Sequence, residues 1–149
     1  MSNSTNVAAG EKIAIVGTID PATVANTEVF TDVVDMSKWH QCLGIALIGN
    51  VAAEAIDFKA YRCAAGGGSA VALKSATQLA AHASNNDGTQ VVINVRAEDL
   101  AASGDQYIKF GLVTGGATGG PCSVVALGVD GRFQPESDND LASVVQIKL

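Results

Sequence analysis

At 149 residues, 48% of them hydrophobic and only 16% charged, the chain has the size and composition of one folded domain and not of a disordered segment. Its net charge of −6 and its singly scattered basic residues argue against nucleic-acid binding, which needs clustered Lys and Arg. No run of about 18 apolar residues is present, so we expect no membrane span, and the N-terminal stretch lacks the pattern of a secretory signal.

The hydrophobic residues are mostly small. Aromatic residues make up 5% of the chain, and Ala and Val supply much of the rest of its hydrophobic residues. Small side chains bury less apolar area each, so each contributes less transfer free energy to the folded state. Burial between subunits would add stability to such a core, and we therefore expect an oligomer.

The first eleven residues, 1–11, are small and polar and show no periodicity. We expect them to form an extended arm in front of a single β-sandwich domain, residues 12–149. Two roles for the arm remain open, because it either becomes ordered on a partner or is a terminus without a role.

Alternation of apolar and polar residues with a period of two predicts the strands. The first, Lys12–Asp20, should end at Pro21, because proline cannot donate to a ladder. The second, Thr27–Met36, mixes both residue types on both sides, which is typical of an edge strand or a bulge. After a turn, Trp39–Asn50 is apolar on both faces, which predicts a central strand with one face in the core and the other under a neighbour or a subunit.

The middle of the chain continues the pattern. Ala53–Ala64 predicts a strand with one polar face, and Gly66–Ser69 predicts a flexible turn. Val71–Ser84 is ambiguous, because VALK fits a strand whereas ATQLAAHAS favours a short helix or an irregular segment. Asn85–Gly88 is a strong turn signal.

The stretch Thr89–Gly116 contains two alternating segments on either side of Ala97–Ser103. Glu98 and Asp99 lie where the first turn of a short helix favours negative charge. The simplest arrangement is a hairpin of two antiparallel strands joined by one helical turn. Neither strand is stable alone, so a second sheet must cover them.

The last third predicts a glycine loop at Gly115–Pro121, a strand at Cys122–Val129, a turn at Asp130–Gly131 and a closing strand at Ala142–Leu149. The total is eight or nine strands about a dozen residues apart, without alternating helices. This spacing predicts an all-β fold, a β-sandwich of jelly-roll type.

Candidate catalytic and metal-binding residues are few. His40 and His82 are the only histidines, and Cys42 lies two positions after His40, so the pair offers two metal ligands at most. The SDND run, Ser137–Asp140, has oxygen ligands but lacks the glycine and distal glutamate of an EF-hand. We expect no metal and no cofactor.

Four acidic residues can be drawn as carboxylate pairs for acid–base chemistry, but they fall at solvent-facing or helix-start positions. These residues are Asp57, Glu98, Asp99 and Asp105. The glycine loops match neither a P-loop nor a dinucleotide-binding fingerprint. We therefore expect no enzyme activity.

Two further residue types leave alternatives open. Cys42, Cys63 and Cys122 are either reduced core thiols or one disulfide and one free thiol. Trp39, the only tryptophan, is either a core anchor or a buried anchor at a subunit contact.

Several segments, taken in order along the chain, carry a resemblance to a known family. They are DVVDMSKWHQCLGIALIGN, a polar strand, a glycine loop, NNDGTQVVINVRAEDL, YIKFGLVTGG and LGVDGRFQPESDNDLASVVQIKL. This order resembles that of the capsid cement, or decoration, proteins of tailed bacteriophages.

The resemblance implies a structural virion protein, made in the host cytoplasm, that trimerises and binds the outer capsid surface across junctions between major capsid protein subunits. Nucleic acid and membranes are not expected partners. The candidate subunit or capsid contacts are Asn3, Val7, Trp39, His40 and Phe133. Two alternatives remain: a head-to-tail or tail component, and a carbohydrate-binding jelly-roll module, which would need exposed aromatics and a calcium site.

Overall fold

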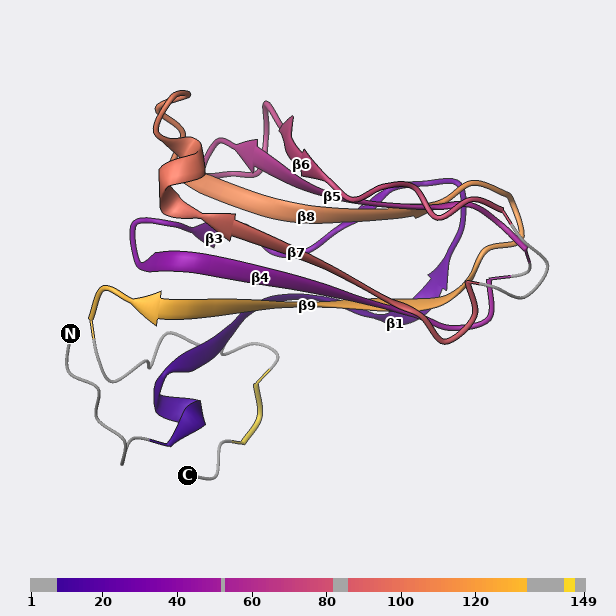
Figure 1. The fold of residues 1–149 in the computed structure, drawn as a ribbon, viewed down its shortest axis with the longest axis horizontal. Coiled ribbons are helices and arrows are strands. Elements are labelled where there is room, and N and C mark those ends of the chain that lie inside the picture. The colour runs from indigo at the N-terminus through magenta and orange to yellow at the C-terminus, as the bar shows by residue number, and fades with distance from the viewer. Residues whose placement is uncertain (1–7, 52, 82–85, 134–143, 147–149) are drawn as a thin grey trace.

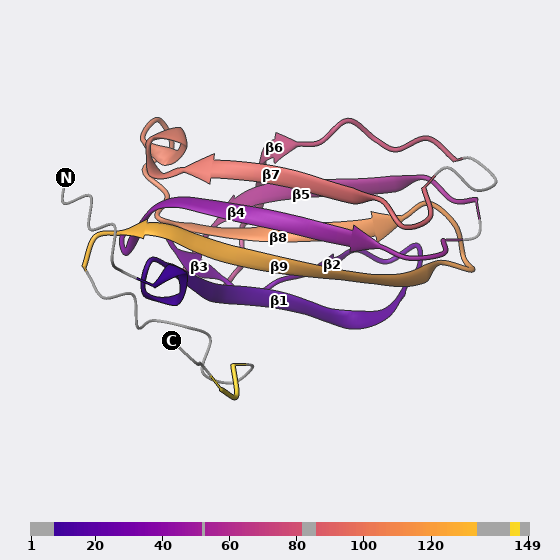
Figure 2. The same ribbon diagram turned by 60° about the horizontal axis from the view of Figure 1, so that its bottom comes forward.

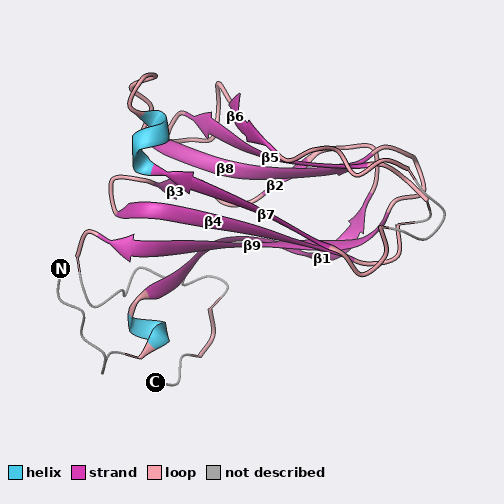
Figure 3. Ribbon diagram, viewed as in Figure 1, coloured by secondary structure: helices cyan, strands magenta, loops and turns pink. Residues whose placement is uncertain are grey.

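The computed structural model describes residues 8–51, 53–81, 86–133 and 144–146, and their regular secondary structure consists almost entirely of β-strands (Figure 1). The described helical segments are two short 3-10 turns, η1 (Ala9–Glu11) and η2 (Ala97–Leu100) (Figure 3). None of the described helices is long and apolar enough to cross a membrane. The predicted all-β class is confirmed.

The strands in the described residues form two antiparallel sheets that pack face to face (Figures 1 and 2). In spatial order, sheet A contains β1 (Ile13–Val24), β9 (Gly120–Gly131), β4 (Trp39–Ile48) and β7 (Gln90–Arg96). In sheet B, β2 (Val29–Phe30) and β3 (Val34–Asp35) share one edge of β8 (Tyr107–Thr114), which is followed by β5 (Ile56–Cys63) and β6 (Val71–Ser75).

The order of strands is that of a jelly roll. β2 pairs with Leu112 and Gly111, and β3 pairs with Ile108 and Tyr107, so the two are successive pieces of one interrupted edge strand. Counted as one, they leave eight strands in the spatial orders 1-8-3-6 and 2-7-4-5, which is the double Greek key of a jelly roll. The expectation of an edge strand or bulge at Thr27–Met36 is confirmed.

The core between the sheets combines aromatic rings with glycines. Phe58 and Phe110 of sheet B stack with their ring centroids 5.8 Å apart. A Cβ at Gly44 on β4 would lie 2.5 Å from the Phe110 ring, so the ring packs directly on the backbone of sheet A. Trp39 is only 2% exposed and packs in the same way on Gly128 of β9. Of the two roles left open for Trp39, the structure therefore shows that of a core anchor.

The predicted hairpin between β7 and β8 is wrong. β7 pairs with β4 in sheet A, whereas β8 pairs with β5 in sheet B, and η2 carries the chain from one sheet to the other (Figure 1). The helical turn itself is confirmed, and the Asp99 carboxylate accepts a 2.8 Å hydrogen bond from the Arg96 N–H at its start. Alternation identifies the buried face of each strand, but it does not identify the pairing partner.

The prediction that Pro21 ends the first strand is also wrong. β1 continues to Val24, and its pairing with β9 shifts register between Ile19 and Ala22. Asp20 and Pro21 therefore form an irregularity in an edge strand of sheet A, where proline is tolerated because no ladder bond is needed from it.

One smaller expectation also differs from the structure, and one ambiguity is resolved by it. Asp130 and Gly131 do not form a turn but extend β9, and Gly131 pairs with Trp39. In the ambiguous stretch, the structure agrees with two of the open alternatives: the VALK segment is strand β6, and the described residues 76–81 are irregular, with a single bridge from Leu79 to Ile56.

The two ends of the chain are described only in part. Residues 8–11 of the predicted arm include η1 and are not extended there, whereas residues 1–7 lie outside the described residues. Within the predicted closing strand, Val144, Val145 and Gln146 are not in a strand, and residues 142–143 and 147–149 lie outside the described residues.

Candidate docking surface

The outer face of sheet A is formed mainly by aliphatic side chains. On β4, Cys42, Gly44, Ala46 and Ile48 are buried against sheet B, so the side chains between them point outward. The same alternation holds along β9. We call the outward set the aliphatic face: Ile13, Leu43, Ile45, Leu47, Val92, Val125, Leu127 and Val129.

The strand register makes this set contiguous. Leu43 of β4 lies directly beside Leu127 of β9, and in the next outward row Ile45 lies between Val125 and Val92. All eight side chains keep contact with solvent, and Val92 on β7 is 56% exposed. Figure 2 turns this sheet toward the viewer and shows its four strands side by side.

The outer face of sheet B is polar by contrast. The Tyr61 hydroxyl donates a 2.7 Å hydrogen bond to Glu28, and burial together with this bond raises the pKa of Tyr61 to about 12. The Lys109 ammonium lies 4.0 Å from the centroid of the Phe30 ring and donates to the carbonyl of Gly67. These polar groups are satisfied within the chain, so sheet B is suited to face water.

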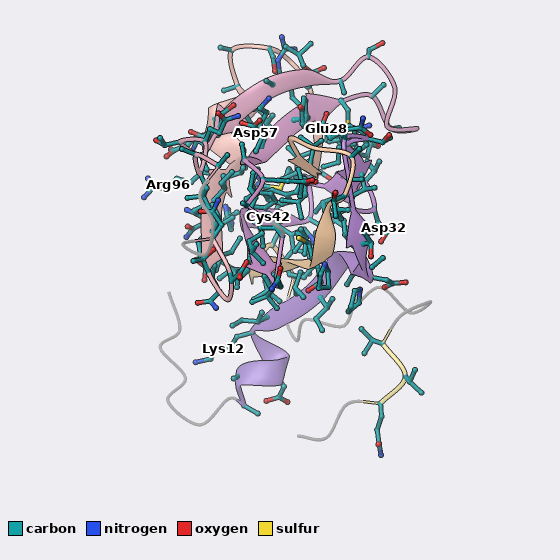
Figure 4. The ribbon with its side chains drawn as sticks, turned by 90° about the vertical axis from the view of Figure 1, so that its right-hand side faces the viewer. Lys12, Glu28, Asp32, Cys42, Asp57 and Arg96 are labelled. Carbon is teal, nitrogen blue, oxygen red and sulfur yellow. The ribbon has the colours of Figure 1, made fainter. Side chains whose placement is uncertain are left out.

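A hollow of about 490 Å³ lies at the end of the aliphatic face where β9 and β7 end and β4 begins. Gln41 on β4 pairs with Val129 of β9 on one side and with Arg96 of β7 on the other. Its side chain donates a hydrogen bond to Asp130 and accepts one from Asn94, both at 3.1 Å. The lining residues are His40, Gln41, Arg96, Ala97, Glu98 and Arg132. Arg96 points outward at the margin of the sandwich (Figure 4).

At the opposite end of the sandwich, Glu54 holds the glycine loop. Its carboxylate accepts hydrogen bonds from the backbone N–H groups of Thr118 and Gly119 at 2.9–3.0 Å. These donors, the Gly119 N–H above all, hold the pKa of Glu54 below its ordinary value of 4.5. The loop between β8 and β9 is therefore fixed to the segment before β5.

The four carboxylates considered for catalysis are not paired with one another. Asp57 accepts from Gln78, Glu98 contacts Arg96, Asp99 contacts Lys74, and Asp105 contacts Arg62. Each carboxylate thus has its own basic or amide partner. Among the described residues, no three His, Cys, Asp or Glu side chains gather as metal ligands.

The cysteines are buried inside the sandwich. Cys42, Cys63 and Cys122 form no disulfide, as the first of their two alternatives predicts. Cys42 lies between the sheets (Figure 4), and burial raises the pKa of its thiol to about 12. A thiol with so high a pKa stays protonated at neutral pH and is a poor nucleophile.

The candidate contact residues fall in different places. Trp39 is in the core, His40 lines the hollow, and Phe133 is 82% exposed just beyond Arg132. Asn3 and Val7 lie outside the described residues, as do His82 and the run 137–140. The candidate set therefore contains one residue of the hollow and none of the aliphatic face.

The aliphatic face, Arg96 and Arg132 were not among the residues singled out from the sequence. The sequence did contain a signal of the aliphatic face, because the segments 39–50 and 122–129 are each apolar on both faces. Only the register between strands shows that the outward faces of these two segments lie side by side.

Comparison with known proteins finds no family model and no curated protein that matches this chain.

Proposed function

We propose that this chain is a structural virion protein of a tailed phage: a cement, or decoration, protein that binds the outer capsid surface as a trimer and stabilises the head by bridging major capsid protein subunits. The main observation that supports this proposal is the aliphatic face. The segment order that resembles cement proteins supports it, and the jelly-roll fold is compatible with it, since the fold serves viral capsids as well as binding modules.

A face of this composition favours contact with protein. Each square ångström of apolar surface removed from water contributes roughly 25 cal/mol, and contiguous apolar patches on stable domains mark interaction sites. The polar face of sheet B supplies the solvent-facing side that a decoration protein needs. In a three-fold ring the contact is head-to-tail, so the aliphatic face of one copy meets a different surface of the next.

The side chains of the described residues are arranged for contact more than for reaction. The carboxylates are bound to separate partners, and the buried Cys42 thiol is held protonated. Bridging capsid subunits requires complementary surface on a rigid scaffold, and it needs no catalytic group.

Replacing Val92 with glutamate tests the proposal, because it places a charge on the aliphatic face at an exposed position that tolerates the larger side chain. Light scattering at micromolar concentration should give a trimer for the wild type and a monomer for Val92→Glu. The monomeric variant should also fail to bind particles that lack the protein.

The matched control is Val71→Glu, which makes the same change at a 46% exposed valine on β6 of sheet B. This variant should remain a trimer and bind particles. A monomeric wild-type protein, or equal trimerisation and particle binding by both variants, would contradict the proposal.

A further inference from the structure

β7 is a regular strand at an open edge of sheet A, and Figure 2 shows β7 and β1 as the two outer strands of this sheet. It pairs with β4 along its whole length without a register shift, and no other described strand pairs with its second edge. The other three edges of the sandwich carry features that discourage pairing. β1 contains Pro21 and two register shifts, β2 and β3 are interrupted, and β6 is short and has one register shift. Of the described edges, β7 is therefore the best suited to accept another strand.

The pairing with β4 determines which backbone groups of β7 this edge leaves open. The Thr89 carbonyl, just before β7, accepts a hydrogen bond from β4. Because alternate residues of a strand direct their N–H and C=O groups to alternate sides, those of Gln90, Val92 and Asn94 point away from β4. Lys74 donates to the Asn94 carbonyl at 3.0 Å. Among the described residues, no hydrogen bond joins the backbone groups of Gln90 or Val92 on this edge.

The chain also contains a segment with the pattern of a strand whose described part has no ladder partner. Residues 142–149, ASVVQIKL, alternate in the way that predicts a strand. Within one copy, however, residues 144–146 are not in a strand, and Val145 is 96% exposed. The ten residues 134–143 that separate Phe133 from this part can span roughly 35 Å when extended, which is enough to reach a neighbouring copy.

We propose that the segment 142–149 of one copy adds to sheet A of a neighbouring copy as a strand beside β7. Main-chain hydrogen bonds to Gln90 and Val92 hold it, and Val145 and Ile147 lie beside Val92, so that the aliphatic face is extended by one strand. The contact joins two different surfaces and can close three copies into a ring, whereas pairing of β7 with β7 would give a two-fold dimer. The exchange rests on the trimer of the proposed function but not on capsid binding.

Asn94→Pro tests the edge, because it removes an N–H group that points away from β4 and leaves the ladder to β4 and the aliphatic face in place. The matched control is Asn94→Ala, which keeps this N–H group; both variants lose the hydrogen bond from the Asn94 side chain to Gln41. At the micromolar concentration at which Asn94→Ala is a trimer by light scattering, Asn94→Pro should be a monomer. Circular dichroism should show the same β-sheet content in both.

The double variant Val144→Pro, Val145→Pro tests the segment at a site that is not part of either sheet. Consecutive residues point to opposite sides of a strand, so one of the two prolines removes a ladder N–H group in either register. This variant should be a monomer, whereas Val144→Ile, Val145→Ile should remain a trimer. Mixing the double proline variant with Asn94→Pro should give one-to-one heterodimers, because one supplies an intact edge and the other an intact segment. A mixture that stays monomeric would rule out exchange between copies.

A blocked peptide with the sequence of residues 142–149 provides an assay that needs neither trimers nor particles. Calorimetry should show it binding to the double proline variant, and binding about tenfold more weakly when that variant also carries Asn94→Pro. Equal affinity for the two proteins would overturn the proposal. If Val92→Glu is a monomer while Asn94→Pro stays a trimer, the exchange is wrong and the proposed function stands, so the two failures are distinguishable.

Discussion

Gly44, at the centre of β4, leaves room for an aromatic ring from the opposite sheet. Phe110 is fully buried and stacked on Phe58, so its ring cannot move aside easily. Glycine is usually unfavourable within a strand because it gains no side-chain packing. Here the missing side chain allows the two sheets to approach.

Gly44→Ala should therefore destabilise the protein by about 1–3 kcal/mol, the usual cost of overpacking a core, because the added Cβ would lie 2.5 Å from the Phe110 ring. Urea denaturation followed by Trp39 fluorescence measures the change. The control is Gly68→Ala, where an added Cβ meets nothing within 4 Å and stability should be unchanged or slightly higher. A Gly44→Ala protein as stable as the control would show that the core can relax around the ring.

For single residues, the sequence predicted the behaviour expected of the residue type better than it predicted which other residues a side chain contacts. The burial of all three cysteines follows from their residue type. The pairs Gly44–Phe110 and Gly128–Trp39 could not be predicted, because each pair depends on how strands distant in sequence are superposed.

Among the elements, the loop between β8 and β9 depends on a single carboxylate. The Glu54 pKa is lowered in the folded state, so its contribution to stability is fully present above pH 4.5 and is lost as the pH falls through the folded value. Protonation of Glu54 weakens its bonds to the N–H groups of Thr118 and Gly119.

Glu54→Gln removes this charge at every pH while keeping the shape of the side chain. We expect the variant to melt at a lower temperature than the wild type at pH 7, and the difference to be smaller at pH 3, because it shrinks as the pH falls below 4.5 and through the lowered folded-state pKa. Calorimetry at both pH values measures it. A difference that stays constant across this range would mean that the Glu54 charge does not stabilise the loop.

The elements also show where periodicity stops being informative. Period-two alternation located most of the strands correctly, and the turn signals located most of the connections. It could not separate a hairpin from a crossover between sheets, because β7 and β8 bury one face in either arrangement. Pro21 was a misleading stop signal, since an edge strand accommodates it at an irregularity.

For the whole molecule, the central feature is the difference between its two outer faces. Sheet B carries hydrogen-bonded and charged groups such as Tyr61 and Lys109, whereas sheet A carries the aliphatic face. The jelly-roll class could be predicted from strand number and spacing. The aliphatic face could be anticipated only as separate segments, 39–50 and 122–129, because the sequence does not assign their strands to one sheet.

The most direct test is an image reconstruction of phage particles with and without this protein, at a resolution that shows its two sheets. We expect trimers on the outer capsid surface, with the aliphatic face buried against protein and the outer face of sheet B turned to solvent. Particles that show no added density on the shell, or trimers that leave the aliphatic face in solvent, would contradict it.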